Sequence, residues 1–271
     1  MNDKFPTIAE IRAAHSARAE YERYLFANRY FFRPLSYGLT WLALRSGLSS
    51  ETVSWLSGLA ALSGFCLLLK PGVPALWPGI GFLLLFNFLD CVDGDISRVM
   101  RTRNPYGRFL DSIMGWADML FWTVIGITVW RLPVLRTAGD AWGLDPHVWP
   151  AAGFLCAFFV SYSSSLEAIF DQVLRPYWEP LAAQGGEVPS SSPLKGKSGA
   201  AFWGRVAVSN LRVRETQYLL LSAACLSGGV DLLLAFYLLF NGLFTFTLLF
   251  TYCRRGKTVF DSGAGREFQS K

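Results

Sequence analysis

The sequence predicts an all-α integral membrane protein with six transmembrane helices and an N-terminal amphipathic helix at the membrane interface. Two observations lead to this class. Of the 271 residues, 52% are apolar and only 17% are charged, which is too apolar for an ordinary soluble domain of this length. The charges also gather in short connectors between long apolar stretches, as is typical of helical membrane proteins.

Six apolar stretches are assigned to membrane-spanning helices, because a hydrocarbon core of about 30 Å requires roughly 20 helical residues. They cover residues 52–69, 76–92, 107–131, 150–170, 216–227 and 231–253. The fifth stretch is the shortest, and Arg212 and Arg214 obscure its start. An even number of spans places both termini on the same side of the membrane.

The basic residues predict which side that is. With the N-terminus inside, only Lys70, Arg131 and Arg136 of the 25 Lys and Arg residues fall outside, which leaves 22 inside. This is the bias that the positive-inside rule describes, and it favours a cell (inner) membrane protein with cytoplasmic termini. Because the basic residues lie in connectors and not on one face of a soluble fold, they indicate contact with lipid headgroups and not with nucleic acid.

The chain is divided into three parts on these grounds. Residues 1–48 are expected to form a cytoplasmic and interfacial segment, residues 49–255 the membrane domain and residues 256–271 a cytoplasmic tail. In the first part, Ile8 and Ile11 begin an apolar pattern of roughly helical spacing among basic residues. Such a pattern predicts a helix that lies on the membrane surface.

Aspartates gather at the predicted inner ends of the second and third spans. Asp90 and Asp93 are three residues apart, so their carboxylates leave one helix face about 5–6 Å apart at Cβ. Asp111 follows a connector short enough to make the next helix an antiparallel neighbour. Clustered carboxylates repel one another unless a cation lies among them. Oxygen ligands without neighbouring His or Cys favour Mg²⁺ or Mn²⁺.

Basic and glycine residues flank these aspartates. Arg98 and Arg108 are positioned to hold a phosphate or diphosphate, and Gly94 and Gly107 leave room for a ligand to approach the backbone. Arg33 either binds an acceptor phosphate or anchors the chain to anionic lipid, and the sequence leaves both open. Together these residues predict a metal-dependent phosphoryl-transfer site that faces the cytosol. Helix capping and membrane anchoring alone do not explain so many residues at this spacing.

The same stretch resembles the signature of the CDP-alcohol phosphotransferase family. That signature reads D-x-x-D-G-x-x-A-R, eight residues, G, three residues, D, three residues, D. The matching positions are Asp90, Asp93, Gly94, Arg98, Gly107 and Asp111. Residues 33–54 also resemble the family's entry into its first spanning helix.

The resemblance implies a six-helix membrane enzyme, often a homodimer. It would cleave a CDP-linked donor, release CMP and move a phosphoryl-alcohol unit, such as a phosphatidyl group, to a hydroxyl acceptor in phospholipid or related synthesis. Two divalent ions, Mg²⁺ or Mn²⁺, are implied. The implied metal ligands are Asp90, Asp93 and Asp111, and the implied nucleotide contacts are Gly94, Arg98 and Gly107.

The chain departs from the signature at two positions. Ser97 replaces the usual alanine, which is a small change. Gly115 stands where the family has its fourth aspartate, a metal ligand and the proposed general base. Asp118 follows three residues later, on the same helix face as Asp111 but about 10.5 Å along the axis. Asp118 can replace the missing base only if the acceptor hydroxyl or the helix shifts. Otherwise the reaction needs no fourth carboxylate or the protein has lost catalysis, and the sequence leaves these three readings open.

Two alternatives remain open. The first is a catalytically impaired member of the same family that serves as a binding or scaffold subunit, because the fourth aspartate is missing. The second is a cation-coupled transporter that uses the membrane aspartates. Transport predicts carboxylates near the bilayer midplane and an internal repeat, whereas these aspartates cluster at one boundary, so it is the less favoured of the two.

Overall fold

The computed structural model describes residues 5–19, 21–101, 105–184 and 199–262, and all regular structure in these ranges is helical. The predicted all-α class is therefore confirmed. The α-helices are α1 (Ile8–Ala19), α2 (Arg33–Arg45), α3 (Ser50–Leu68), α4 (Leu76–Val99), α5 (Pro105–Trp116), α6 (Phe121–Arg131), α7 (Thr137–Ala141), α8 (Val148–Ile169), α9 (Arg175–Gln184), α10 (Ala200–Arg212), α11 (Arg214–Ser227) and α12 (Val230–Asp261). Short 3₁₀ or π turns join several of them: η1 (Tyr21–Tyr24), η2 (Asn28–Phe32), η3 (Val73–Ala75), η4 (Ala117–Leu120), η5 (Pro133–Leu135) and η6 (Phe170–Leu174).

Five helical segments in the described ranges are long and apolar enough to cross a membrane. They are Ser50–Leu68, Val73–Val99, Pro105–Arg131, Val148–Ala182 and Val230–Asp261. They identify an integral membrane protein and correspond to the first four predicted spans and the sixth. The predicted fifth span is not confirmed, because α11 has only 14 residues. The backbone is extended at Val213 before α11 and left-handed at Gly228 after it, which fixes both ends of this helix.

The last two spans are longer than the sequence predicts. Helix α8 continues through the π turn η6 into α9, beyond the predicted end at residue 170. Helix α12 continues to Asp261, so Arg254 and Arg255 lie within the helix and do not end it. Because a helix rises about 1.5 Å per residue, the 32 residues of α12 exceed a hydrocarbon core.

The third span is a helix with an interruption. Its two halves, α5 and α6, are joined by the 3₁₀ turn η4, where the sequence predicts one continuous helix. A 3₁₀ turn is wound more tightly than an α-helix, so it shifts the angular relation between the two halves. Asp118 lies inside this turn, and its position relative to Asp111 therefore differs from the one that an uninterrupted helix would give.

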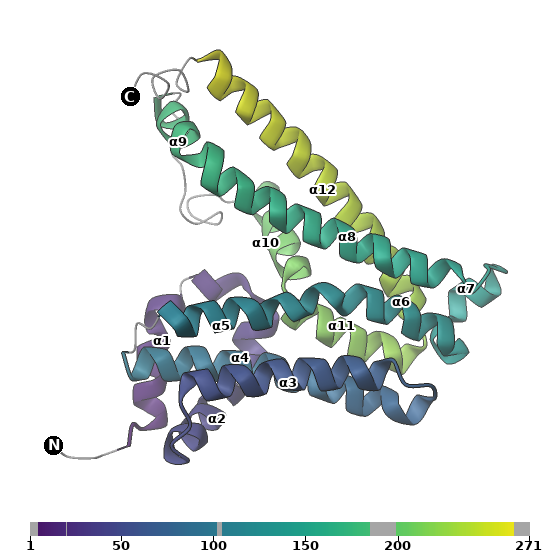
Figure 1. The fold of residues 1–271 in the computed structure, drawn as a ribbon, viewed down its shortest axis with the longest axis horizontal. Helices are drawn as coiled ribbons and strands as arrows, with labels where there is room; N and C mark the ends of the chain where they lie inside the picture. Colours follow the sequence, from purple (N-terminus) through teal and green to yellow (C-terminus); the bar gives the residue numbers. More distant parts are fainter. Residues whose placement is uncertain (1–4, 20, 102–104, 185–198, 263–271) are drawn as a thin grey trace.

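Helices α3 and α4 pack side by side, and α8 packs between α6 and α12 (Figure 1). The crossing of α6 and α8 is close because two glycines meet there. A Cβ atom at Gly126 would lie 2.5 Å from the Trp149 carbonyl oxygen, and one at Gly153 would collide with the Trp122 carbonyl. Small residues let membrane helices approach in this way. Away from this crossing, α8 and α12 diverge from α3, α4 and α5 (Figure 1).

The N-terminal helix α1 packs against α2 and α4. Ile11 and His15 on α1 are buried, whereas Ile8 is 48% exposed. The buried face of α1 therefore contacts protein, and Ile8 and Phe5 remain the apolar side chains available to a membrane surface. The predicted interfacial position of this helix stays a prediction.

Candidate active site

The predicted metal ligands lie on two neighbouring helices. Asp90 and Asp93 are on α4, and Asp111 is on α5. The charges of Asp90 and Asp111 both act on Asp93, so the structure brings the three carboxylates into one electrostatic group. Asp93 is the buried member at 6% exposed, and Asp111 is exposed.

Ser54 of α3 holds Asp93 in place. Its hydroxyl donates a hydrogen bond of 2.6 Å to Asp93 Oδ2, and it is itself buried. Ser54 lies one turn inside α3, whose N-cap is the Ser49 side chain. Sequence reasoning did not identify Ser54, because its pairing with Asp93 depends on how α3 packs on α4.

Arg214, the first residue of α11, adds a positive charge to this group. Its Nη2 atom lies 2.5 Å from Asp90 Oδ1, and its guanidinium stacks over the Phe86 ring with Cζ 4.4 Å from the centroid. The sequence places Arg214 only near the start of a helix, so its partner was not predictable. Asp90 thus has a cationic partner within the chain itself.

Asp118, the predicted substitute base, points to α11. It accepts a hydrogen bond of 2.5 Å from the Tyr218 hydroxyl, and the charge of Arg214 acts on it as well. Asp118 therefore belongs to the same charge group as Asp90 through Arg214. At Gly115, where the family has an aspartate, a Cβ atom would meet no other atom within 4 Å. The structure thus has room for the missing side chain.

The motif arginine bends back over the motif glycine. Arg98 Nη2 donates a hydrogen bond of 2.6 Å to Asp95 Oδ1. A Cβ atom at Gly94 would lie 3.1 Å from that same nitrogen, so a side chain there would press on the guanidinium. Gly94 therefore leaves the space in which Arg98 sits.

The other predicted site residues are Gly107, Arg108 and Arg33. Gly107 lies in the first turn of α5, and Arg108 follows it on the exposed surface. Arg33 is only 7% exposed. It forms a two-pronged ion pair with Glu22 and also reaches Asp95. Binding of an acceptor phosphate or of lipid by Arg33 stays a prediction.

The donor chemistry of the aspartate group fits a divalent metal. Three carboxylates without a neighbouring imidazole or thiolate ligand suit Mg²⁺ or Mn²⁺, and their mutual repulsion calls for a cation. Among the described residues, however, no three His, Cys, Asp or Glu side chains already form a closed ligand set. The carboxylates would have to draw together around an ion.

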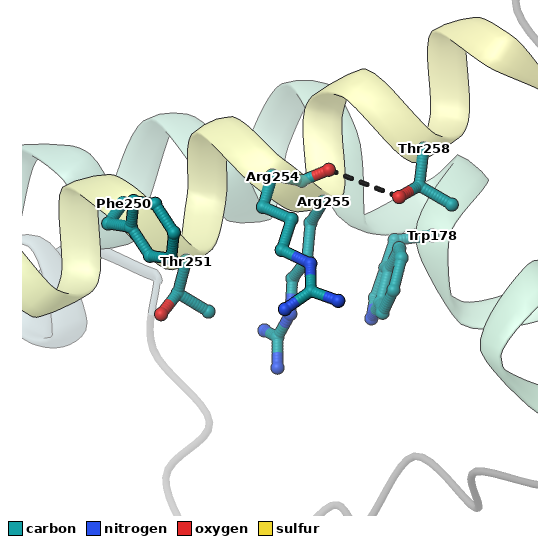
Figure 2. A pocket seen from close by; sticks show the side chains of 6 residues that line it. All are labelled: Trp178, Phe250, Thr251, Arg254, Arg255 and Thr258. Carbon is teal, nitrogen blue, oxygen red and sulfur yellow. Dashed lines mark hydrogen bonds between the residues drawn. The ribbon is translucent and has the colours of Figure 1, made fainter.

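A separate cavity of about 310 Å³ lies on α9 and α12. Figure 2 shows Arg254 and Arg255 of α12 pointing into it beside Trp178 of α9. Thr258 donates a hydrogen bond of 3.1 Å to the Arg254 carbonyl oxygen. Phe250 and Thr251 complete the lining. None of the predicted site residues lines this cavity.

The helical fold is that of an integral membrane protein, and its second and third spans carry the aspartate–glycine–arginine motif. In a comparison with known families, the sequence model of the CDP-alcohol phosphatidyltransferase family matches residues 49–167. The resemblance drawn from the motif is thus confirmed, and these residues form a CDP-alcohol phosphatidyltransferase domain. The match runs from the N-cap of α3 to Glu167 near the end of α8. A comparison with curated proteins found no match.

Proposed function

We propose that the protein transfers a phosphoryl-alcohol unit from a CDP-linked donor to a hydroxyl acceptor and releases CMP. The observation that carries this proposal is the convergence of Asp90, Asp93 and Asp111 within the matched domain. Donors with a diphosphate need cationic groups at the breaking bond. We further propose a role in phospholipid or related synthesis, at the cytosolic face of the cell membrane and in a homodimer.

The aspartate group would hold the divalent ion. When bound by carboxylates, Mg²⁺ or Mn²⁺ neutralises charge on the diphosphate oxygens. Ser54 orients Asp93 for this task through its 2.6 Å hydrogen bond. Residues that orient a metal ligand commonly tune its affinity for the ion.

Arg98, Gly94 and Gly107 are the donor contacts in this proposal. Gly94 leaves the α4 surface flat beside the Arg98 guanidinium. A guanidinium recognises phosphate oxygens through paired N–H donors. Arg108, exposed on the next helix, is available to the same anion.

Asp118 is the proposed base. The acceptor hydroxyl oxygen forms a bond to the phosphorus that carries the donor's alcohol, and the bond from that phosphorus to the bridging oxygen breaks. The electron pair leaves with CMP, and the hydroxyl proton passes to Asp118. The hydrogen bond from Tyr218 fixes the orientation of the Asp118 carboxylate, which general-base catalysis requires.

Two observations favour a second candidate function, a catalytically impaired family member that binds the donor. Gly115 removes the fourth carboxylate, and Arg214 already neutralises Asp90 in the structure. A protein of this kind would bind CDP compounds without releasing CMP. It would serve as a binding or scaffold subunit.

CMP release distinguishes the two candidates. Purified protein in lipid nanodiscs would be incubated with Mn²⁺ or Mg²⁺, with CDP-diacylglycerol or a water-soluble CDP-alcohol, and with a panel of hydroxyl acceptors. We expect acceptor-dependent CMP release that stops when the metal is chelated. Binding of a CDP compound without release by any pair would favour the impaired candidate, and neither binding nor release would overturn both.

A further inference from the structure

A buried ionic cluster connects the N-terminal segment to the motif. It consists of His15, Glu22, Arg33, Asp95 and Arg98. The first four are each less than 8% exposed, and Arg98 is partly exposed at the edge of the cluster. The cluster thus joins α1, η1 and α2 to the part of α4 that carries the signature.

Arg33 is the centre of the cluster. Its Nε and Nη2 atoms donate to the two carboxylate oxygens of Glu22 at 3.0 and 2.8 Å. Its Nη1 atom lies 3.3 Å from Asp95 Oδ1. A buried charge is tolerated only when its partners are well placed, and Arg33 has a carboxylate on each side.

His15 ties α1 to both carboxylates. Its Nε2 atom lies 3.0 Å from Glu22 Oε2, and its Nδ1 atom lies 3.4 Å from Asp95 Oδ1. The sequence offered no partner for His15, because these contacts come from three elements. The imidazole therefore bridges the two acids.

Asp95 contacts both Arg33 of the N-terminal segment and Arg98 of the motif. Its Oδ1 atom accepts hydrogen bonds from Arg98 at 2.6 Å and from Arg33 at 3.3 Å. Its Oδ2 atom accepts a hydrogen bond of 3.3 Å from Ser36. Asp95 occupies an unspecified position of the signature, directly after Gly94, so the family resemblance assigns it nothing. Its 1% exposure keeps it from touching a ligand itself.

We propose that Asp95 is a positioning residue, held by the N-terminal segment, that fixes the Arg98 guanidinium beside Gly94 for donor binding. The inference rests on the proposed function, in which Arg98 contacts the CDP donor. It assigns Arg33 to the support of Asp95 and not to an acceptor phosphate. His15, Glu22 and Arg33 thereby support the donor site from outside the matched residues, which begin at residue 49.

Without Asp95, the Arg98 guanidinium is free to move away from Gly94. The conformational entropy that Arg98 gains must then be lost when the donor binds, which weakens binding. A role in stability alone predicts something different. Loss of Asp95 would then weaken the fold equally whether Arg98 is present or not. Coupling between the two residues in donor binding therefore separates positioning from structure.

The test is a double-mutant cycle on Asp95→Asn and Arg98→Gln in the full-length protein. The affinity for CDP would be measured by calorimetry with Mn²⁺ present, together with thermal unfolding of each variant. Asp140→Asn is the matched control, because Asp140 also pairs with an arginine on its own helical turn, at 3.2 Å from Arg136 Nε, but on α7. We expect Asp95→Asn to weaken CDP binding by about tenfold, the usual effect of losing one charge-assisted hydrogen bond.

In the Arg98→Gln background, Asp95→Asn should cause no further loss, and the Asp140→Asn control should bind CDP as the wild type does. Losses that multiply across the two variants, or tighter binding by Asp95→Asn, would overturn the inference. If Asp95→Asn does not fold, His15→Gln replaces it in the same cycle, with a smaller expected loss. Wild-type protein that binds no CDP compound would overturn the proposed function and this role together. Losses of affinity that multiply across the two variants would overturn the inference alone.

Discussion

Arg214 and Asp90 form an ion pair of 2.5 Å between α11 and α4. The first aspartate of the signature is thus neutralised by a residue that lies outside the matched domain. The side chains of Arg214 and Asp90 are 17% and 25% exposed, so solvent weakens the pair only in part. Any cation that binds the aspartate group must share Asp90 with this guanidinium or displace it.

Arg214→Gln should therefore destabilise the metal-free protein. Removing one partner of this partly exposed pair leaves the Asp90 carboxylate unpaired, at a cost of about 1–3 kcal/mol. Thermal unfolding in nanodiscs would show a lower Tm than that of the wild type. Adding Mn²⁺ should raise the Tm of the variant more than that of the wild type, because the ion supplies the missing charge. Equal responses to Mn²⁺ would contradict this competition.

Loss of a signature carboxylate tests the metal assignment. Asp93→Asn and Asp111→Asn should each abolish CMP release and weaken Mn²⁺ binding measured by calorimetry. Ser54→Ala removes only the hydrogen bond to Asp93 and should weaken Mn²⁺ binding by about tenfold, as loss of a residue supporting a ligand commonly does. Near-normal Mn²⁺ binding by Asp93→Asn would show that the assignment is wrong.

The base assignment predicts a separate pattern. Asp118→Asn should lower the rate of CMP release by about 10²–10⁴-fold, with little change in CDP binding. Gly115→Asp should restore part of that rate, because a side chain there meets open space. A fully active Asp118→Asn would make Asp118 a structural partner of Tyr218. A wild type that is inert while Gly115→Asp alone gains activity would favour the impaired candidate.

The buried cluster predicts how stability depends on pH. Asp95 and then Glu22 raise the pKa of His15 above its usual 6.5, against the opposing effects of burial and Arg33. The protonated form is therefore favoured in the folded protein. This contribution is fully present below about pH 6.5 and disappears as the pH rises through the raised pKa.

The measurement is the difference in Tm between the wild type and His15→Gln from mildly acidic to alkaline pH. We expect the difference to be largest on the acidic side of this range and to shrink above it. Burial alone would raise the pKa of Glu22, but His15 and Arg33 outweigh it and lower that pKa to about 2. Because Glu22 contributes fully above its usual 4.5, it should not change across this window. A Tm difference that is independent of pH would contradict the protonation of His15.

The charge bias predicts membrane orientation. In a cysteine-free background, a probe at Leu144 between α7 and α8 should react with an impermeant maleimide added outside intact cells. A probe at Phe260, near the end of α12, should react only after the cells are lysed. Both positions are well exposed. Labelling of Phe260 from outside would contradict the orientation inferred from the 22-to-3 distribution of basic residues, and with it the cytosolic position of the site.

The first four spans and the motif were predictable because their signals are local. Hydropathy located α3 to within two residues, since 52–69 became Ser50–Leu68. The signature residues lie within 22 positions of one another, and helix periodicity alone places Asp90 and Asp93 on one face. The fifth span stays a prediction, because the 14 residues of α11 before Gly228 are shorter than a membrane crossing.

The partners of the site residues were not predictable. Arg214, Tyr218 and Ser54 reach their aspartates from other helices, and no spacing in the sequence records which helices meet. His15 is isolated in the sequence and becomes a buried partner of Asp95 only through the packing of α1 on α4. Local patterns thus identified the groups that carry charge, whereas tertiary packing decides which of them neutralise one another.

The glycine crossing of α6 and α8 has a mechanical consequence. It acts as a fulcrum, because Gly126 and Gly153 fix the closest approach and α8 departs from the bundle beyond it (Figure 1). From Gly153 to Ile169 the helix is about 24 Å long at ~1.5 Å per residue. A tilt of about 5° at the crossing would swing its far end by about 2 Å.

That far end is not free to swing without effect. Glu167, near the end of α8, accepts two hydrogen bonds of 2.9 Å from Arg212. Arg212 precedes Arg214 by two residues. A shift of Glu167 would therefore pull on Arg212, two residues before the arginine that pairs with Asp90. A methyl group at Gly126 would collide with the Trp149 carbonyl oxygen, and we expect the resulting tilt of α8 to change the distance between Arg214 and Asp90.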